Sequence, residues 1–594
     1  MMSKLPKVLG SLPKENYRQL LYHEKVFCSS YLMNTRNVHQ QKKMTQRINN
    51  SAHTMAVIEN NIKLSNNLNI RKFANTTEAP QPVKKFGILR KILKISFGSI
   101  LALLTTGGLL IAKKVYEDEE DPVSPENMTA PSNRSDINKE WVEFMLTNYE
   151  NRQKPGTKVT VNTFDVGDAT QKGDGYAGEH IKLLVNATIQ NDADKEQSGV
   201  IYDKEYNLFV KLLNPHPIMQ QMMKYNKSDL NELLLYSDIM EDFQKFQASR
   251  TNENVCMNTP NFIYGKWTNK QFVLVLENMK PHGYGQNPKE NSLNLHQAKL
   301  GLEQIARLHA VSHAYNKETN LLDKYPSYDI SALQELFVVV GYERLLDACI
   351  LYLKGKEGNE DLVKKMSSTK SKVVKKAGHE DLFNDSKIKC LIHGDCWNNN
   401  FLFKADFDEN GHEIFTNSEK MLVLDFQVLH WGTPMFDLCM YIYTNTTAQF
   451  RKDHLEEILF YYHSTFTDIL TKLNFEEPSW TYEQFKSEYD RVFPWYLQFG
   501  LNSAMIHSDA MKEMTLGKSD PGPSGPMWTK IKAAAAKLVI PLILHPVICE
   551  LTMGDILNPM IKELLEDKTR PFCDRMLEII LEAEENGIFD ESRY

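Results

Sequence analysis

LIHGDCWNNNFLF, Leu391–Phe403, and MLVLDFQ, Met421–Gln427, are the segments from which the fold of this 594-residue chain is predicted. Each contains a short apolar run, which is typical of a buried strand. If the two strands pair as a hairpin, the polar stretch between them loops away. Asn400, where the first strand begins, and Asp425, where the second ends, then lie together and face Asp395 in a glycine-opened loop. The structural alternative is a capped turn above a buried hairpin, with no chemical role.

These three side chains suit phosphoryl transfer. The reaction needs a carboxylate that orients the acceptor hydroxyl and takes its proton. It also needs oxygen ligands for Mg²⁺, which bridges the phosphates and offsets developing charge. HGD alone is a weak signal, but HGD followed by N-x-L-F and an apolar strand ending in DF is specific. The pattern predicts an ATP- and Mg²⁺-dependent kinase with one active site around Asp395, Asn400 and Asp425.

A glycine-rich segment upstream is the first candidate for nucleotide binding. GDGYAG, Gly173–Gly178, precedes the strand candidate IKLLVNATI, Ile181–Ile189. Gly173, Gly175 and Gly178 would let the backbone approach phosphate oxygens closely. A glycine-rich hairpin turn without any special function has the same appearance.

Lys211 is the second candidate, because it places an ammonium group in the apolar strand candidate YNLFVKLL, Tyr206–Leu213. A buried lysine is costly unless an acidic group pairs with it. Glu232, on the next predicted helix at Leu230–Phe246, suits the lysine–glutamate pair that positions the α- and β-phosphates in kinases. The alternatives are an exposed lysine on an edge strand and a solvated glutamate.

The chain changes character near residue 280. The strand candidates before that point lie at 159–166, 181–189, 206–213 and 272–276. Helical patterns dominate after it, apart from the one strand pair described above. This order predicts an α+β, two-lobed, protein-kinase-like fold. Its parts would be a small β-rich N-lobe at 139–280, which binds the nucleotide, and a large helical C-lobe at 281–594, which is catalytic and binds the acceptor.

Roughly residues 139–565 resemble the CHK kinase-like family, also called ecdysteroid kinase-like, which is related to choline and aminoglycoside phosphotransferases. Its pattern H-G-D-x-W-x-N-N-x-L-F is met by His393, Gly394, Asp395, Trp397, Asn399, Asn400, Leu402 and Phe403. Its D-F-Q is met by Asp425, Phe426 and Gln427. Further matches are LVLENM at 274–279, ARLHAVSHA at 306–314 and GTPMFDL at 432–438.

The resemblance implies a role for each matched residue. Asp395 would be the catalytic base, and Asn400 and Asp425 would be the metal ligands. The hinge between the lobes, Glu277–Met279, would meet the adenine of ATP through its backbone; Glu277 and Met279 are its two ends. Asp437 would hold the catalytic loop, through His393 or the loop amides. His309 and His313, four residues apart on a helix, are interpreted as packed core histidines.

The departures from protein kinases narrow the substrate. The chain has no Walker sequence, HGD in place of HRD, and DFQ in place of DFG. These features favour a small-molecule acceptor, and the resemblance suggests an ecdysteroid or another apolar alcohol. Two alternatives stay open: a choline- or aminoglycoside-type kinase, and a membrane-tethered pseudokinase that acts as an interaction module.

Charge is distributed unevenly along the chain. The net charge of −7 gives no reason to expect a nucleic-acid partner. Residues 1–94, however, contain 17 Lys and Arg against 4 Glu and no Asp, a net charge of +13, without a hydrophobic period. They are predicted to form a basic tail of low order. Residues 113–138 are predicted to be an acidic Pro/Ser linker.

The segment between tail and linker is a candidate membrane anchor. Residues 95–112 form a run of 18 residues without a charge, flanked by lysines and arginine. Such a run is long enough for a transmembrane helix, although a buried helix is the alternative. The expected location is a membrane-anchored protein whose kinase domain faces the cytosol, where ATP is available. A mitochondrial membrane is one alternative, and a soluble cytoplasmic protein is another if the segment comes from an error in gene prediction. Nothing in the composition predicts an oligomeric state.

Overall fold

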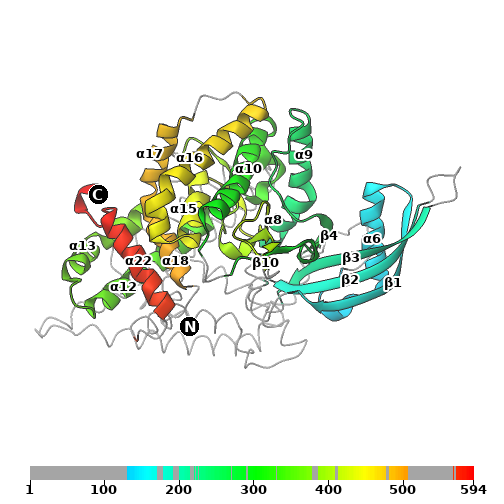
Figure 1. Ribbon diagram of the computed structural model, residues 1–594, viewed down its shortest axis with the longest axis horizontal. Helices are drawn as coiled ribbons and strands as arrows, with labels where there is room; N and C mark the ends of the chain where they lie inside the picture. Colours follow the sequence, from blue (N-terminus) through cyan, green and yellow to red (C-terminus); the bar gives the residue numbers. More distant parts are fainter. Residues whose placement is uncertain are drawn as a thin grey trace, which may run out of the picture. The chain divides into compact units, whose positions relative to one another are not determined.

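The computed structural model describes residues 130–169, 178–191, 200–214, 220, 223–224, 226–268, 271–288, 292–328, 331–377, 386–407, 413–475, 480–505, 566 and 570–594 (Figure 1). The tail, the candidate membrane segment at 95–112, Gly173 and Gly175 lie outside these residues. Among the residues that are described, no helix is both long enough and apolar enough to cross a membrane.

A five-stranded antiparallel sheet forms the first part of the described chain (Figure 1). Its strands are β1 (Thr157–Asp168), β2 (Gly178–Asn191), β3 (Val200–Leu213), β4 (Phe262–Trp267) and β5 (Phe272–Glu277). Their order across the sheet is β1-β2-β3-β5-β4, so β3 is an interior strand with a partner on each side. All four predicted strands of this half are confirmed, and each is longer than its pattern indicated.

Helix α6 (Lys139–Gln153) covers one face of this sheet. Asn138 caps its first turn by accepting from the Trp141 amide at 2.9 Å. Trp141 and Met145, one turn apart, are fully buried against alternate residues of the strands, among them Val161 and Leu183. The opposite face of the sheet carries Lys211.

Between β3 and β4 lies the helical segment that carries Glu232. It consists of α8 (Ser228–Leu234), a π-helical turn, η2 (Leu235–Ile239), and α9 (Met240–Ala248). The predicted helix is therefore confirmed, with a π turn inside it. Such turns are rare and are frequent near functional sites.

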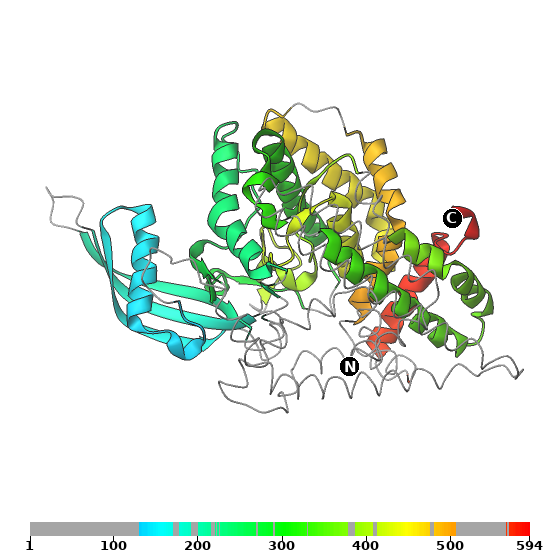
Figure 2. The ribbon, with the colours of Figure 1, turned by 180° about the vertical axis from the view of Figure 1, so that it is seen from behind.

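The second part of the described chain is mainly helical and is built around α10 (Leu295–Thr319), which packs on α16 (Ala448–Lys472). The remaining helices are α11 (Leu321–Lys324), α12 (Ser331–Lys354), α13 (Glu360–Ala377), α15 (Pro434–Asn445), α17 (Tyr482–Arg491), α18 (Phe493–Met505) and α22 (Arg570–Glu585). Short 3₁₀ turns are η1 (Arg134–Asp136), η3 (Lys280–His282), η4 (Pro326–Tyr328), η5 (Asn398–Asn400) and η6 (Glu591–Arg593). Helix α22, red in Figure 2, packs against α18.

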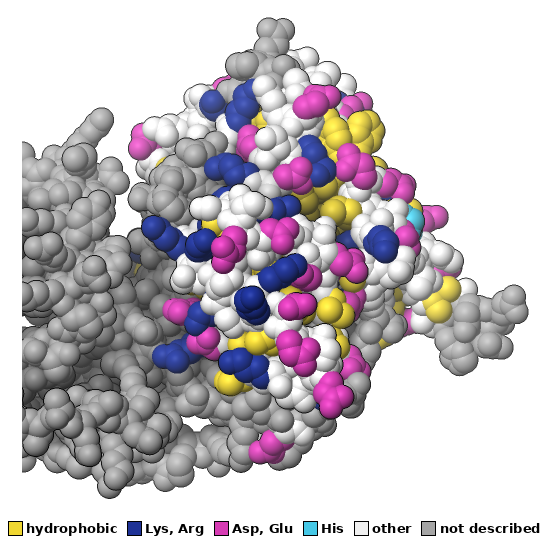
Figure 3. Space-filling view, turned by 90° about the vertical axis from the view of Figure 1, so that its left-hand side faces the viewer, with side chains coloured by type: hydrophobic (Ala, Val, Ile, Leu, Met, Phe, Trp, Pro, Cys, Tyr) yellow, Lys and Arg dark blue, Asp and Glu magenta, His cyan; other side chains and the backbone are white. Residues whose placement is uncertain are grey.

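Helix α22 is also tied to this part by a buried ion pair. The Arg451 guanidinium on α16 donates from Nε to Glu582 Oε1 of α22 at 2.8 Å, and its second nitrogen binds Oε2. On the face shown in Figure 3, basic and acidic side chains are interspersed. Among the ion pairs of the helical part, Lys370 Nζ of α13 lies 2.6 Å from Asp347 Oδ1 of α12.

The short strands lie among these helices. Strand β8 (Phe401–Lys404) pairs antiparallel with β11 (Met421–Val423), which confirms the predicted hairpin, and β6 (Tyr284–Gly285) joins on the other side of β8. The expectation of a single strand pair was wrong, because β7 (Cys390–Ile392) pairs with β12 (His430–Gly432) and β9 (Asp406–Phe407) with β10 (Glu413–Ile414). These segments are two or three residues long, too short for a periodic pattern to appear in the sequence.

Candidate active site

The loop between β7 and β8 carries Asp395, and a glycine allows it to turn. Gly394 has φ +79°, a conformation that L side chains rarely adopt. A Cβ at this position would also lie 2.6 Å from the Val428 carbonyl oxygen. The strand that follows begins at Phe401, one residue later than predicted, because Asn400 ends the 3₁₀ turn η5.

Asp395 and Asn400 meet in this loop. Asn400 Nδ2 donates to Asp395 Oδ2 at 2.9 Å and to the Asp395 carbonyl oxygen at 2.8 Å. Trp397 Nε1 donates to the same Oδ2 at 3.2 Å. Burial, together with the nearby charge of Asp425, raises the pKa of Asp395 to about 7.

Asp437, in the first turn of α15, binds the loop through its carboxylate group. It accepts hydrogen bonds from the His393 amide at 2.6 Å and from the Gly394 amide at 2.8 Å. His309 Nε2 of α10 lies 3.0 Å from the same carboxylate. The side chains of Asp437, His393 and His309 are all buried. The predicted role of Asp437 is therefore confirmed. His309 is a core residue as predicted, with the addition that it contacts Asp437.

Asp425 follows β11 and is brought to Lys211. It lies two residues beyond the end of the strand and has φ +59°, an uncommon conformation for a residue other than glycine. Asp425 Oδ1 is 3.2 Å from Lys211 Nζ, which is also 2.7 Å from Glu232 Oε2. Lys211 and Glu232 are almost fully buried, whereas the Asp425 side chain is 35% exposed. The lysine thus bridges one buried and one accessible carboxylate.

The electrostatics of this cluster follow from its burial. Burial alone would lower the pKa of Lys211, but the charges of Asp425 and Glu232 outweigh it and raise the pKa. Burial raises the pKa of Glu232 to about 7, with Lys211 acting in the opposite direction. For Asp425 the lysine charge outweighs burial, so its pKa lies below the ordinary value. The interior position of β3 excludes the alternative of an exposed edge-strand lysine.

A family model described as ecdysteroid kinase-like matches residues 172–475. The chain belongs to the ecdysteroid kinase-like family. The match spans four of the five sheet strands, β2 to β5, together with the Lys211–Glu232 pair, the Asp395 loop and Asp425. Membership of this family supports the activity of a small-molecule phosphotransferase for the chain.

Two solved structures are similar to this ecdysteroid kinase-like chain at low scores. One is a Plasmodium vivax ethanolamine kinase, with 11% identity and a TM-score of 0.30, covering 72% of this chain and 95% of the other. The second is a macrolide 2'-phosphotransferase type I, with 12% identity and a TM-score of 0.27, covering 69% and 98%. Scores of this size carry no argument about function. No curated protein matches the chain.

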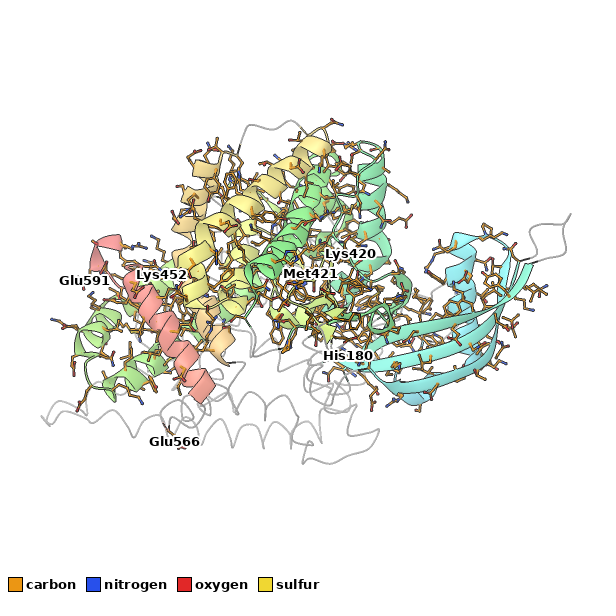
Figure 4. All side chains as sticks on the ribbon, viewed as in Figure 1. His180, Lys420, Met421, Lys452, Glu566 and Glu591 are labelled. Atoms are coloured by element: carbon orange, nitrogen blue, oxygen red, sulfur yellow. The ribbon has the colours of Figure 1, made fainter. Side chains whose placement is uncertain are left out.

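The structure describes only some of the predicted nucleotide-binding residues of this family member: Gly178 is among them, and Gly173 and Gly175 are not. Gly178 begins β2 opposite Leu213, and a Cβ there would lie 2.7 Å from the Leu212 carbonyl oxygen. Close packing between strands therefore accounts for Gly178 without any phosphate. His180, two residues on, lies with its ring 5.1 Å from that of Phe209, beside the start of β2 (Figure 4).

The expected hinge is held by its own contacts. Glu277 Oε1 lies 2.9 Å from His282 Nε2, and Oε2 accepts from Asn261 Nδ2 at 2.6 Å. The Met279 carbonyl oxygen accepts from the His282 amide at 3.0 Å and from the Tyr284 amide at 3.2 Å. A hollow of about 600 Å³ is lined by Glu277 and His282 together with residues of β1, β2 and β3, and by none of Lys211, Glu232, Asp395, Asn400 and Asp425.

Sequence reasoning gave no role to two residues that complete the cluster. Gln427 Nε2 donates to Asp229 Oδ1 at 3.2 Å, and Asp229, only 2% exposed, precedes Glu232 by one helical turn. Burial raises the pKa of Asp229 to about 6, with the Lys211 charge opposing it. The ring of Phe426 lies 5.4 Å from that of Tyr236 in the π turn. The one available signal was the i, i+3 spacing of the two acids on a helix.

The oxygen atoms of the loop and of Asp425 fit a magnesium ion. Asn400 donates from Nδ2 to Asp395, so its Oδ1 is available to bind the ion. Asp425 contacts Lys211 through Oδ1, so its Oδ2 is available in the same way. The described residues contain no group of three His, Cys, Asp or Glu side chains that could hold a metal. Mg²⁺ commonly takes one or two protein oxygens and completes its shell with phosphates and water. Asn400 and Asp425 match that pattern.

Proposed function

We propose that this chain is an ATP- and Mg²⁺-dependent phosphotransferase that transfers the γ-phosphoryl group to a hydroxyl of a small molecule. The proposed acceptor is an ecdysteroid or another apolar alcohol, in keeping with the family to which the chain belongs. The proposal includes a two-lobed, protein-kinase-like arrangement, in which the nucleotide binds between the sheet and the helical part.

The observation that carries the proposal is the bridge made by Lys211. Its ammonium group contacts Glu232 at 2.7 Å and Asp425 at 3.2 Å, and these residues come from β3, α8 and the end of β11. A purely structural ion pair needs one acid, whereas this lysine faces a second carboxylate that is accessible to solvent. A lysine in that position supplies a positive charge for the α- and β-phosphates.

Each residue has a defined part in the proposed reaction. Lys211 binds the phosphates, and Glu232 holds Lys211 in place. Asn400 and Asp425 would hold the magnesium ion, which offsets the charge of the phosphates when it is bound. Asp395 orients the acceptor hydroxyl and takes its proton. Asp437 keeps the loop amides, and therefore Asp395, in position.

A direct assay tests the proposal. We would incubate the purified chain with ATP and Mg²⁺ and, in separate arms, with ecdysone, other sterol alcohols, choline, ethanolamine and an aminoglycoside. Mass spectrometry would then identify any product that has gained a phosphoryl group, with an EDTA-treated reaction as control. A product only with ecdysone or sterols supports the proposal. A product only with choline, ethanolamine or the aminoglycoside replaces the acceptor class, and no product in any arm contradicts the enzymatic function.

A further inference from the structure

The two carboxylate oxygens of Asp395 have different surroundings. Oδ2 accepts two hydrogen bonds, from Asn400 Nδ2 at 2.9 Å and from Trp397 Nε1 at 3.2 Å. No residue of the described chain donates a hydrogen bond to Oδ1. The residue is partly accessible, and Oδ1 is not among the buried side-chain atoms without a hydrogen-bond partner, so Oδ1 is the oxygen that an acceptor hydroxyl can reach.

From this asymmetry we infer that Trp397 is a positioning residue: its indole N–H holds Oδ2 so that Oδ1 faces the acceptor. The inference rests on the proposed function and assigns a role to a residue two positions after the base. In the reaction, the acceptor O–H proton passes to Asp395 Oδ1. The hydroxyl oxygen forms a bond to the γ-phosphorus, the bond from that phosphorus to the bridging oxygen breaks, and ADP leaves with the electron pair.

The backbone around Trp397 is rigid enough for this role. The Trp397 amide donates to the Asp395 carbonyl oxygen at 2.9 Å, and the Trp397 carbonyl oxygen accepts from the Asn400 amide at 2.9 Å. The preceding carbonyl, of Cys396, accepts from Asn445 Nδ2 of α15 at 2.9 Å. The indole is therefore attached to a turn that is fixed on both sides and anchored to a helix.

A second donor is needed because Asn400 has another task. Its Oδ1 is a proposed metal ligand, so one amide group would serve both the ion and Asp395. If Asn400 alone oriented Asp395, the position of the base would depend on whether the ion is bound. The indole N–H of Trp397 has no other partner among the described residues, and it keeps Oδ2 in place independently of the metal.

Trp480 provides a matched control within the same chain. Its Nε1 also donates to a carboxylate, Glu488 Oε1, at 3.2 Å. Trp480 is buried among the aromatic side chains of α16 and α17, including Phe466 and Phe485. Trp397→Phe and Trp480→Phe therefore remove the same kind of bond at the same distance, one at the base and one elsewhere.

The geometry can be tested without any acceptor. The chain contains 7 Trp, and the indole N–H resonance of Trp397 is identified by its loss in Trp397→Phe. We expect Asp395→Asn to shift that resonance and to leave the resonance lost in Trp480→Phe unchanged. An unshifted Trp397 resonance overturns the inference even if the enzyme is active.

The kinetic test uses whichever alcohol the wild-type chain phosphorylates in the panel above. We expect Trp397→Phe to lower kcat about tenfold, as for one lost hydrogen bond to a charged group, with the KM for ATP unchanged within about twofold. Trp480→Phe should retain wild-type kcat. In an Asp395→Asn background, Trp397→Phe should cause little further loss, because the indole acts through that carboxylate.

The outcomes separate the inference from the function on which it rests. Wild-type turnover with an unchanged kcat in Trp397→Phe overturns the role of Trp397 alone. An equal loss in both phenylalanine variants, or a tenfold loss that persists in the Asp395→Asn background, overturns it as well, because the effect is then structural. A wild-type chain that phosphorylates nothing overturns the proposed function and the inference together.

Discussion

At the scale of single residues, Asp395 is the side chain on which the proposed chemistry depends. Asp395→Asn keeps the shape of the side chain and removes its ability to take a proton. We expect turnover to fall at least about a hundredfold, since a positioned acid–base group typically contributes 10²–10⁴. ATP binding should persist, because the proposed role of Asp395 is toward the acceptor. Turnover within a few-fold of wild type would remove Asp395 from the mechanism.

In the proposed function, Asp425 is the residue on which metal-dependent binding of the nucleotide depends. Asp425→Ala removes both the proposed Mg²⁺ ligand and one of the two acids that contact Lys211. We expect the Mg²⁺-dependent part of ATP affinity to disappear, since the ion offsets phosphate charge only where its carboxylate holds it. Calorimetric titration of ATP with Mg²⁺ and with EDTA measures that part. An unchanged Mg–ATP affinity would rule out the assignment.

At the scale of elements, the D-F-Q segment ties the end of β11 to the segment that carries Glu232. Asp425 contacts Lys211, Phe426 packs on Tyr236, and Gln427 donates to Asp229. The glycine of a D-F-G segment has no side chain for the third contact. The α8 segment of this chain is therefore held in the lysine-pairing position by the loop itself.

Gln427→Ala tests whether the hydrogen bond from Gln427 to Asp229 holds α8 in place. We expect the amides of α8 to exchange with solvent about tenfold faster, because one hydrogen bond to a buried carboxylate is lost. Helix α16 in the same molecule is the internal reference and should be unaffected. Hydrogen exchange followed by mass spectrometry resolves the two helices. Identical exchange in α8 of variant and wild type would show that the contact does not hold the helix.

The link between α15 and the loop that carries Asp395 predicts an effect of pH on stability. Burial alone would raise the pKa of Asp437, but His309, His393 and the Gly394 amide outweigh it, so the folded pKa lies below the ordinary value. The stabilisation is therefore complete above the unfolded pKa of about 4 and is lost as pH falls through the folded pKa.

Asp437→Asn isolates that contribution. The variant should be less stable than wild type at neutral pH. The difference should shrink as pH falls from about 4, where Asp437 of the unfolded chain becomes protonated, through the lower pKa of the folded chain. Denaturant unfolding of both chains across this pH range measures the difference. A difference that is constant with pH would show that the carboxylate charge does not stabilise the loop.

At the scale of the whole molecule, we propose that residues 95–112 anchor the chain in a membrane, with the catalytic residues on the cytosolic side. This segment lies outside the described residues, and the catalytic residues all follow the linker at 113–138. The full chain should sediment with membranes and resist carbonate extraction. A chain that stays in the soluble fraction contradicts the anchor. If protease added to intact membranes fails to cleave the catalytic part of the protein, the proposed orientation is contradicted.

Local patterns were enough to predict the parts of the fold that depend on neighbouring residues. An alternating pattern indicated β1, and segments rich in Ile, Val and Leu indicated β2 and β3. The hairpin of β8 and β11 followed from two short apolar runs. Lys211 and Glu232 were paired correctly, because an ammonium group in an apolar strand requires an acid and the next helix offered one. The domain boundaries at 139, 280 and 281 stay predictions.

Tertiary structure alone decided the contacts between segments that are distant along the chain. Gln427 meets Asp229, His309 meets Asp437, and the Trp397 indole turns back onto the oxygen of Asp395 that Asn400 also binds. No periodic pattern in the sequence predicts these contacts, because a hydrogen bond depends on the direction of a side chain and on which helix lies opposite it. The sequence by itself determined which residues could do the chemistry. Packing decided the surroundings of Asp395, because only the folded loop brings an indole N–H and an amide to the same carboxylate oxygen.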